Sequence, residues 1–119
     1  MVQKRILIAE DDTAQREMLA RFAKRKGYDV VVVTDGVELL KASANERIDL
    51  IITDLNMPDL NGASAAEILK LQDNSVPVIA LTAHSPNELK LVQNTFTKIF
   101  HKPCDFIELF EYVESLIGK

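Results

Sequence analysis

Short hydrophobic runs alternate along the chain with longer stretches in which apolar positions recur at helical spacing. The runs are rich in β-branched residues, and most show little polar alternation, which is typical of strands buried on both faces of a sheet. The pattern predicts five strands, at residues 5–9, 29–33, 49–53, 77–81 and 98–101.

The stretches between these strands begin with residues that cap helices. Each start has a Ser or Asp followed three residues later by Gln or Glu, so a side-chain oxygen can accept from an unpaired helix amide. In the last stretch, 106–117, the apolar stripe is better explained by packing on a sheet than by a cofactor groove. Five helices are expected, with starts at Asp12, Asp35, Ser64, Ser85 and Asp105.

This alternation of strands and helices predicts an α/β domain with a parallel sheet covered on both faces. Because crossovers are right-handed, few topologies remain. For this length the leading one is a flavodoxin-like (βα)5 three-layer sandwich of strand order 2-1-3-4-5, which binds ligands at the carboxyl ends of strands 1 and 3. Residues 1–119 are expected to form a single domain, with no output domain in the chain.

Composition narrows the class of protein. The chain has 119 residues, of which 47% are hydrophobic, and a formal charge of −4, which fits one globular domain. Fourteen basic against 18 acidic residues argue against direct binding of nucleic acid. A single cysteine, Cys104, excludes an internal disulfide and favours a reducing compartment. No apolar run approaches a membrane span, so a cytoplasmic location is expected.

Polar residues follow the strands at the places where ligands would bind. Acidic residues 10–12 follow the first strand, Asp54 the third, Thr82 the fourth and Lys102 the fifth. Taken alone, each of these residues could have a purely structural role. Residues 10–12 and Thr82 could be helix caps, Asp54 could be a turn residue, and Lys102 could be an exposed charge. Those explanations do not account for their convergence at one edge of a parallel sheet.

The convergence predicts a metal ion and phosphoryl chemistry. Glu10, Asp11 and Asp54 contribute −3 and Lys102 contributes +1, and carboxylates about 4 Å apart repel by roughly 1–4 kcal/mol. A divalent cation would cancel the excess, and an all-oxygen site favours Mg²⁺. With Thr82 nearby, such a site suits phosphoryl transfer. No Gly-rich phosphate loop is present, which leaves a carboxylate that itself accepts the phosphoryl group.

Four motifs at these strand ends carry a resemblance that covers the whole chain. They are ILIAEDD at 6–12, DLIITDLNMPDLNG at 49–62, PVIALTA at 77–83 and HKP at 101–103. The chain resembles the receiver domains of two-component response regulators, such as the chemotaxis receiver. The resemblance implies the 2-1-3-4-5 order and a signalling switch that is not an enzyme, although it catalyses its own phosphotransfer and autodephosphorylation.

The resemblance also implies a role for each residue. Asp54 is the phosphoacceptor, Thr82 donates its hydroxyl to the bound phosphoryl group, and Lys102 pairs with that group, with its Lys–Pro peptide bond usually cis. Asp12 is left as a helix cap. The ion, Mg²⁺ with Mn²⁺ as a substitute, has as ligands Glu10 through water, Asp11, Asp54 and the backbone carbonyl of Asn56.

Partners and phosphoryl lifetime follow from the same resemblance. The donor is a histidine kinase or a histidine phosphotransfer protein, and the output is a downstream protein target or a fused domain. The chain fits a stand-alone receiver as well as a piece of a larger regulator or hybrid kinase. Asn56 and His84 occupy positions that tune loss of the phosphoryl group, although His84 could also be an ordinary exposed loop residue.

The chain departs from the family pattern near the fifth strand. Most relatives carry Tyr or Phe at the position of Ile99, and Phe100 is expected on the opposite face because side chains alternate along a strand. This puts in question the usual coupled movement of Thr82 and an aromatic side chain. The segment 93–98 lacks the usual Ala-Gly connection, and Cys104 is expected to be a small packed residue.

Three rival classes require sequence features that this chain does not have. A pseudo-receiver, which binds partners without accepting phosphate, would be favoured by loss of the acidic pair, Asp54 or Lys102, and all are present. A phosphatase of the haloacid dehalogenase type needs a second Asp where Asn56 stands. A flavodoxin needs a Ser/Thr/Gly-rich phosphate loop where this chain has acids.

Overall fold

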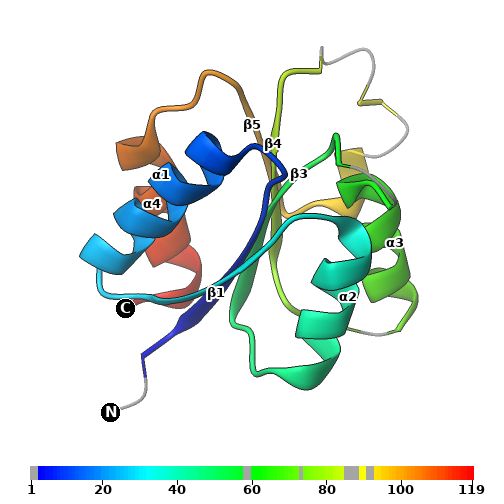
Figure 1. The fold of residues 1–119 in the computed structure, drawn as a ribbon, viewed down its shortest axis with the longest axis horizontal. Coiled ribbons are helices and arrows are strands. Elements are labelled where there is room, and N and C mark those ends of the chain that lie inside the picture. Colours follow the sequence, from blue (N-terminus) through cyan, green and yellow to red (C-terminus); the bar gives the residue numbers. More distant parts are fainter. Residues whose placement is uncertain (1–2, 58–59, 73, 85–88, 91–92) are drawn as a thin grey trace.

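The structure of the protein is a computed structural model, which describes residues 3–57, 60–72, 74–84, 89–90 and 93–119. Within them, five parallel strands form one sheet of order β2-β1-β3-β4-β5. This confirms the predicted flavodoxin-like topology. Figure 1 shows α1 and α4 on one side of the sheet and α2 and α3 on the other.

The strands are β1 (Arg5–Ala9), β2 (Asp29–Val33), β3 (Leu50–Asp54), β4 (Val78–Thr82) and β5 (Lys98–His101). The helices in the described part of the chain are α1 (Thr13–Arg25), α2 (Gly36–Asn45), α3 (Gly62–Leu71), α4 (Phe106–Ile117) and the short 3-10 helix η1 (Gln93–Thr95). Strands β3 and β4 both run one residue later than predicted. The proposed site residues Asp54 and Thr82 are therefore the last residues of their strands.

Three of the predicted helix caps are confirmed and one is wrong. Asp12, Asp35 and Asp105 cap α1, α2 and α4, and each accepts a hydrogen bond from a backbone N–H of the first turn. Helix α3 begins earlier than predicted, because the side chain of Asn61, not Ser64, is the cap and accepts from the Ser64 N–H at 2.9 Å.

The helix predicted to begin at Ser85 falls largely on residues outside the described part of the chain. Between β4 and β5 the structure describes a turn at 89–90 and the 3-10 helix η1. The prediction of a fifth helix, with its cap at Ser85, therefore stays a prediction.

Alternating side chains of the sheet supply two hydrophobic cores. Strand residues such as Ile6, Ile8 and Ile52 pack with α1 and α4, whereas Leu7 and Ile51 pack with α2 and α3. Both faces of the central strands are thus buried, which explains their lack of polar alternation. Among the described residues, the buried polar side chains are those of Glu10, Thr53 and Thr82, which lie at or next to the carboxyl ends of β1, β3 and β4.

No helix in the described part of the chain is both long and apolar enough to span a membrane.

Candidate functional site

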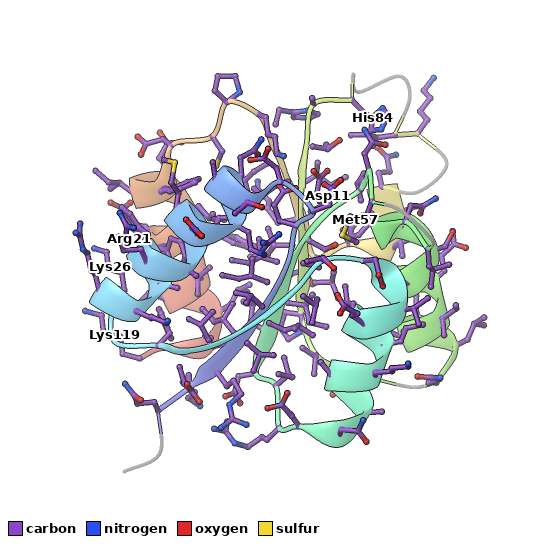
Figure 2. All side chains as sticks on the ribbon, viewed as in Figure 1. Asp11, Arg21, Lys26, Met57, His84 and Lys119 are labelled. Carbon is purple, nitrogen blue, oxygen red and sulfur yellow. The ribbon has the colours of Figure 1, made fainter. Side chains whose placement is uncertain are left out.

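Three carboxylates meet beyond the carboxyl ends of β1 and β3. One oxygen from each of Glu10, Asp11 and Asp54 can be chosen so that all lie within 4.8 Å of one another. Lys102, which follows β5, places its Nζ 2.9 Å from Glu10 Oε1 and 3.1 Å from Asp54 Oδ2. The predicted convergence of these four residues is confirmed. Figure 2 shows Asp11, Met57 and His84 at this end of the molecule.

Burial sets the electrostatics of the cluster. Glu10 is only 2% exposed, and loss of solvent raises the pKa of its carboxyl to about 7, although the hydrogen bond from Lys102 opposes the shift. Desolvation lowers the pKa of Lys102, but its hydrogen bonds to Glu10 and Asp54 outweigh this and leave the pKa raised. One ammonium thus balances only part of the charge of three carboxylates.

The donor set suits a hard divalent cation. Three carboxylate oxygens at this spacing, with exposed Asp11 open to solvent, match the oxygen ligands that Mg²⁺ takes while it keeps part of its water shell. Such an ion would also favour the ionised form of Glu10. The cluster therefore fits a divalent metal.

The loop after β1 separates the roles of its acidic residues. The Glu10 N–H donates to Val33 O at 3.1 Å and so extends the pairing of β1 with β2. Asp12 accepts from the Gln15 N–H at 2.8 Å, which confirms it as a helix cap. Because Asp12 is engaged at the start of α1, Glu10 and Asp11 are the two acids left at the end of the sheet.

The Asp54 carboxylate is held at both oxygens. Oδ1 accepts from the Asn56 N–H at 3.1 Å, and Oδ2 accepts from Lys102. The Thr53 hydroxyl donates to the Asp54 carbonyl at 2.8 Å. A Cβ built on Gly62 would lie 2.2 Å from that carbonyl oxygen, so only glycine lets α3 start so close to the end of β3.

Thr82 is the last residue of β4, the strand next to the one that ends in Asp54. Its side chain is buried, and its Oγ1 accepts from the His84 N–H at 3.0 Å, which leaves the hydroxyl hydrogen for another acceptor. The Lys102 N–H donates to Thr82 O at 2.8 Å, and the Lys102–Pro103 peptide bond is cis, as the resemblance implied.

A contact across two loops was not foreseen from the sequence. His84 Nε2 lies 2.9 Å from Asn56 Oδ1, and His101 Nδ1 lies 3.2 Å from the His84 carbonyl oxygen, a distance at which an Nδ1–H would donate to it. The sequence predicts a role for Asn56 and for His84 separately, from their positions after Asp54 and Thr82. Their approach depends on loop conformation, for which the spacing of residues carries no signal.

The two hydrophobic residues of β5 point to opposite faces, as expected. Ile99 packs against the core on the side of α2 and α3, whereas Phe100 packs on the other side, 5.8 Å from the ring of Tyr112. Cys104 is half-buried, and burial raises the pKa of its thiol. The position at which the family usually carries an aromatic side chain is thus filled by Ile99, which is paired with Ala80 in the sheet, whereas Thr82 is paired with His101.

Comparison with known proteins identifies the family. The sequence profile described as "Response regulator receiver domain" matches residues 6–114. The chain belongs to this family. Receiver domains are the phosphoacceptor switches of two-component signalling, and they work with histidine kinases and downstream effectors.

Individual relatives agree with this assignment. The chain is 38% identical over 117 residues to the transcriptional regulatory protein PrrA of Mycobacterium tuberculosis, a match that covers 97% of this chain and 50% of PrrA. Its structure is similar to the receiver domain of a Francisella response regulator, with a TM-score of 0.90, 29% identity and coverage of 96% of each chain. The chain spans half or less of the length of the first curated relatives it matches.

A third relative bears on the metal. The receiver domain of a sensor histidine kinase from Pseudomonas aeruginosa has a TM-score of 0.89 and 28% identity, with coverage of 99% of this chain and all of that one. In that protein a magnesium ion is coordinated in the active-site cleft. The acidic cluster of this receiver domain is compatible with the same ion and with phosphorylation of an aspartate.

Proposed function

We propose that this receiver domain takes a phosphoryl group onto Asp54 from a phosphohistidine of a histidine kinase or histidine phosphotransfer protein. The observation that carries the proposal is the Asp54 carboxylate, held between the Asn56 N–H and the Lys102 ammonium inside a cluster of three carboxylates. A side chain held in this way presents an oxygen to an incoming phosphorus without further ordering.

In the transfer step an Asp54 oxygen attacks phosphorus in line. A phosphorus–oxygen bond forms as the phosphorus–nitrogen bond of the donor breaks, and the electron pair returns to the imidazole nitrogen. The acyl phosphate is later lost when water attacks phosphorus and the carboxylate leaves. Both steps are catalysed within the domain, which remains a switch and not an enzyme acting on a separate substrate.

The residues around Asp54 stabilise the transferring oxygens. We assign the ion to Glu10 through water, Asp11, Asp54 and the Asn56 carbonyl; when bound, Mg²⁺ would neutralise charge on the phosphoryl oxygens. Lys102 would exchange its contact with Asp54 for one with the phosphoryl group. The buried Thr82 hydroxyl would donate to another of its oxygens. Mn²⁺, with the same preference for oxygen, is expected to replace Mg²⁺.

The output of the domain is proposed to be a protein contact. We propose that residues 1–119 act as one receiver domain in the cytoplasm and that the target is a separate protein or a domain fused to it. Direct binding to nucleic acid or membrane is not part of the proposal. Thr82 would report phosphorylation without the usual aromatic partner, because Ile99 stands at that position.

Incubation with a small-molecule phosphodonor, followed by intact mass, tests the chemistry. We expect one phosphoryl adduct that requires Mg²⁺ or Mn²⁺ and is lost in Asp54→Asn. Asp12→Asn is the matched control, because it removes a neighbouring carboxylate that caps α1 and lies outside the proposed ligand set. No adduct with any donor would indicate the alternative, a pseudo-receiver that signals without phosphate.

A further inference from the structure

Arg16 is bound to the backbone of the acidic loop. Its Nη1 donates to the Glu10 carbonyl at 2.9 Å and to the Asp11 carbonyl at 3.3 Å, and its Nη2 lies 3.4 Å from Thr13 Oγ1. One guanidinium therefore contacts both peptide groups that carry the two acidic side chains of the metal cluster. Neither composition nor motif spacing singled out this residue.

The place of Arg16 in its helix is unfavourable by itself. The side chain belongs to the first turn of α1, where the helix dipole favours acids, yet this turn contains no acid. The Arg16 N–H makes one of the first hydrogen bonds of the helix, to Asp12 O at 2.9 Å. A cation there is stabilised by the two loop carbonyls and by attraction to the Glu38 carboxylate, and the two hydrogen bonds to the loop point to a role in holding it.

The other hydrogen bonds of the loop leave its middle peptide groups free to rotate, and Arg16 restrains that rotation. The Glu10 N–H is tied to β2 through Val33 O, and the Asp12 N–H donates to Glu10 Oε2 at 3.3 Å. These bonds restrain the start and the end of the loop. Rotation of the peptide groups between them would swing the Asp11 carboxylate, and Arg16 Nη1, by donating to both of their carbonyl oxygens, restrains that rotation.

We propose that Arg16 is a positioning residue for the divalent ion. By holding the Glu10 and Asp11 carbonyls, it keeps the carboxylates of these two residues close to that of Asp54, where the three together would bind the ion. The inference rests on the proposed function insofar as the acidic cluster binds Mg²⁺. Arg16 would touch neither the ion nor the phosphoryl group, and it would act through the orientation of the residues that do.

Two effects of Arg16 on metal affinity have opposite signs, which makes the idea testable. Its positive charge repels a cation, so removing that charge would tighten Mg²⁺ binding if electrostatics alone mattered. Its hydrogen bonds order the loop, so removing them would weaken binding if positioning dominates. Loss of groups that orient metal ligands typically lowers affinity by about 10–100-fold. The direction of the change in the Kd for Mg²⁺ identifies the dominant effect.

The experiment is calorimetric titration of the full chain with MgCl₂, in the absence of a phosphodonor, for wild type, Arg16→Gln, Arg16→Lys and Arg21→Gln. We expect Arg16→Gln to weaken Mg²⁺ binding about tenfold, with partial rescue by Arg16→Lys, which keeps one charged donor nitrogen but lacks the second nitrogen that lies near Thr13 Oγ1. Arg21, on the same helix but away from the loop (Figure 2), is the control for loss of charge. Arg21→Gln is expected to leave the affinity unchanged or slightly tighter.

Thermal unfolding of each variant without metal ensures that the titrations are made on folded protein. Binding by Arg16→Gln as tight as wild type, or tighter, would overturn the proposal, as would an equal weakening in Arg21→Gln. A wild-type chain that binds no Mg²⁺ would instead contradict the metal site of the proposed function. As a second readout, amide exchange at residues 10–12 should be faster in Arg16→Gln than in wild type, and equal rates would also count against the proposal.

Discussion

His84 Nε2 lies 2.9 Å from Asn56 Oδ1, so the side chains two positions after Asp54 and two positions after Thr82 form one contact over the site. The contact joins the loop after β3 to the loop after β4. Water that attacks a phosphoryl group on Asp54 would have to approach close to this contact. The two positions are therefore expected to act on phosphoryl lifetime as a pair and not independently.

The paired action predicts non-additive kinetics. Asn56→Ala and His84→Ala are each expected to change the rate at which the phosphorylated protein decays. When the rates are expressed as activation free energies, the change in the double variant should differ from the sum of the two single changes by about 0.5–3 kcal/mol, the range for residues in contact. Decay is followed by intact mass after removal of the donor. Asn45→Ala, at an exposed position at the end of α2, is the control. Unchanged decay in both single variants would refute the prediction.

Gly62 is predicted to be essential to the geometry of Asp54. An added Cβ would lie 2.2 Å from the Asp54 carbonyl oxygen and 2.8 Å from Thr53 Oγ1. Gly62→Ala should therefore lower the free energy of unfolding by about 1–3 kcal/mol and also slow phosphoryl uptake, because the end of β3 must move.

Gly36 offers a matched control for Gly62. A Cβ there would meet the Leu60 carbonyl oxygen at the same 2.2 Å, but not Asp54. Gly36→Ala is expected to destabilise the domain by a similar amount in urea unfolding while it slows uptake much less. Equal uptake by the two folded variants would show that the contact of Gly62 with Asp54 is not what matters.

The fold was predictable because its strongest signals are local. The hydrophobic runs at 29–33 and 98–101 have the same bounds as β2 and β5. Because most of the runs lack polar alternation, they indicate strands buried on both faces, as in a parallel sheet covered by helices. The start of α3 was missed because Ser64 and Asn61 are both good caps. Packing of Gly62 against the end of β3 decided between them, and that close approach is not visible in the sequence.

The site was predictable at the strand ends and not in the loops. Glu10, Asp54 and Lys102 come together because parallel strands end at one edge of the sheet, which follows from topology alone. The contacts of Arg16 with the acidic loop and of His84 with Asn56 depend on side chains that cross between loops. Their partners are set by backbone conformation at each loop, which no periodicity encodes.

The pair of Arg5 and Asp29 predicts an acid-side loss of stability. The Arg5 Nε–H donates to Asp29 Oδ2 at 2.8 Å, and this hydrogen bond lowers the pKa of the Asp29 carboxyl below its ordinary value of 3.8. A lowered folded-state pKa means that the contribution of the pair is present above pH 3.8 and is lost as the pH falls through the folded-state value. Asp29→Asn should therefore flatten the dependence of unfolding free energy on pH below about 4.

Arg5→Gln supplies the check on this assignment. It should flatten the same acid region, and the double variant should add little to either single one. Urea unfolding between pH 3 and pH 7 measures the effect, which is expected to be modest because the Asp29 side chain is 44% exposed. If the wild type and Asp29→Asn lose stability in parallel, the pair does not contribute.

Lys102 is predicted to stabilise the domain in the absence of metal. It balances two carboxylates, those of Glu10 and Asp54, and Glu10 is almost fully buried. Lys102→Met keeps much of the side-chain volume but leaves these charges without their cation. It should lower the free energy of unfolding at neutral pH by about 1–3 kcal/mol. Because a divalent cation also neutralises the carboxylates, saturating Mg²⁺ should recover part of this loss.

The stability that Mg²⁺ restores distinguishes the contribution of the Lys102 charge from that of its side-chain packing. Mg²⁺ should stabilise Lys102→Met more than it stabilises wild type, since binding to the folded state adds a stability that grows with affinity, and the variant has no ammonium competing for the same carboxylates. Lys90→Met, in the described turn between β4 and β5, is the control for a general loss of positive charge. Urea unfolding with and without Mg²⁺ measures the stabilisation by the ion in wild type and in Lys102→Met. Equal stabilisation of wild type and Lys102→Met would mean that the ion and the ammonium do not share these carboxylates.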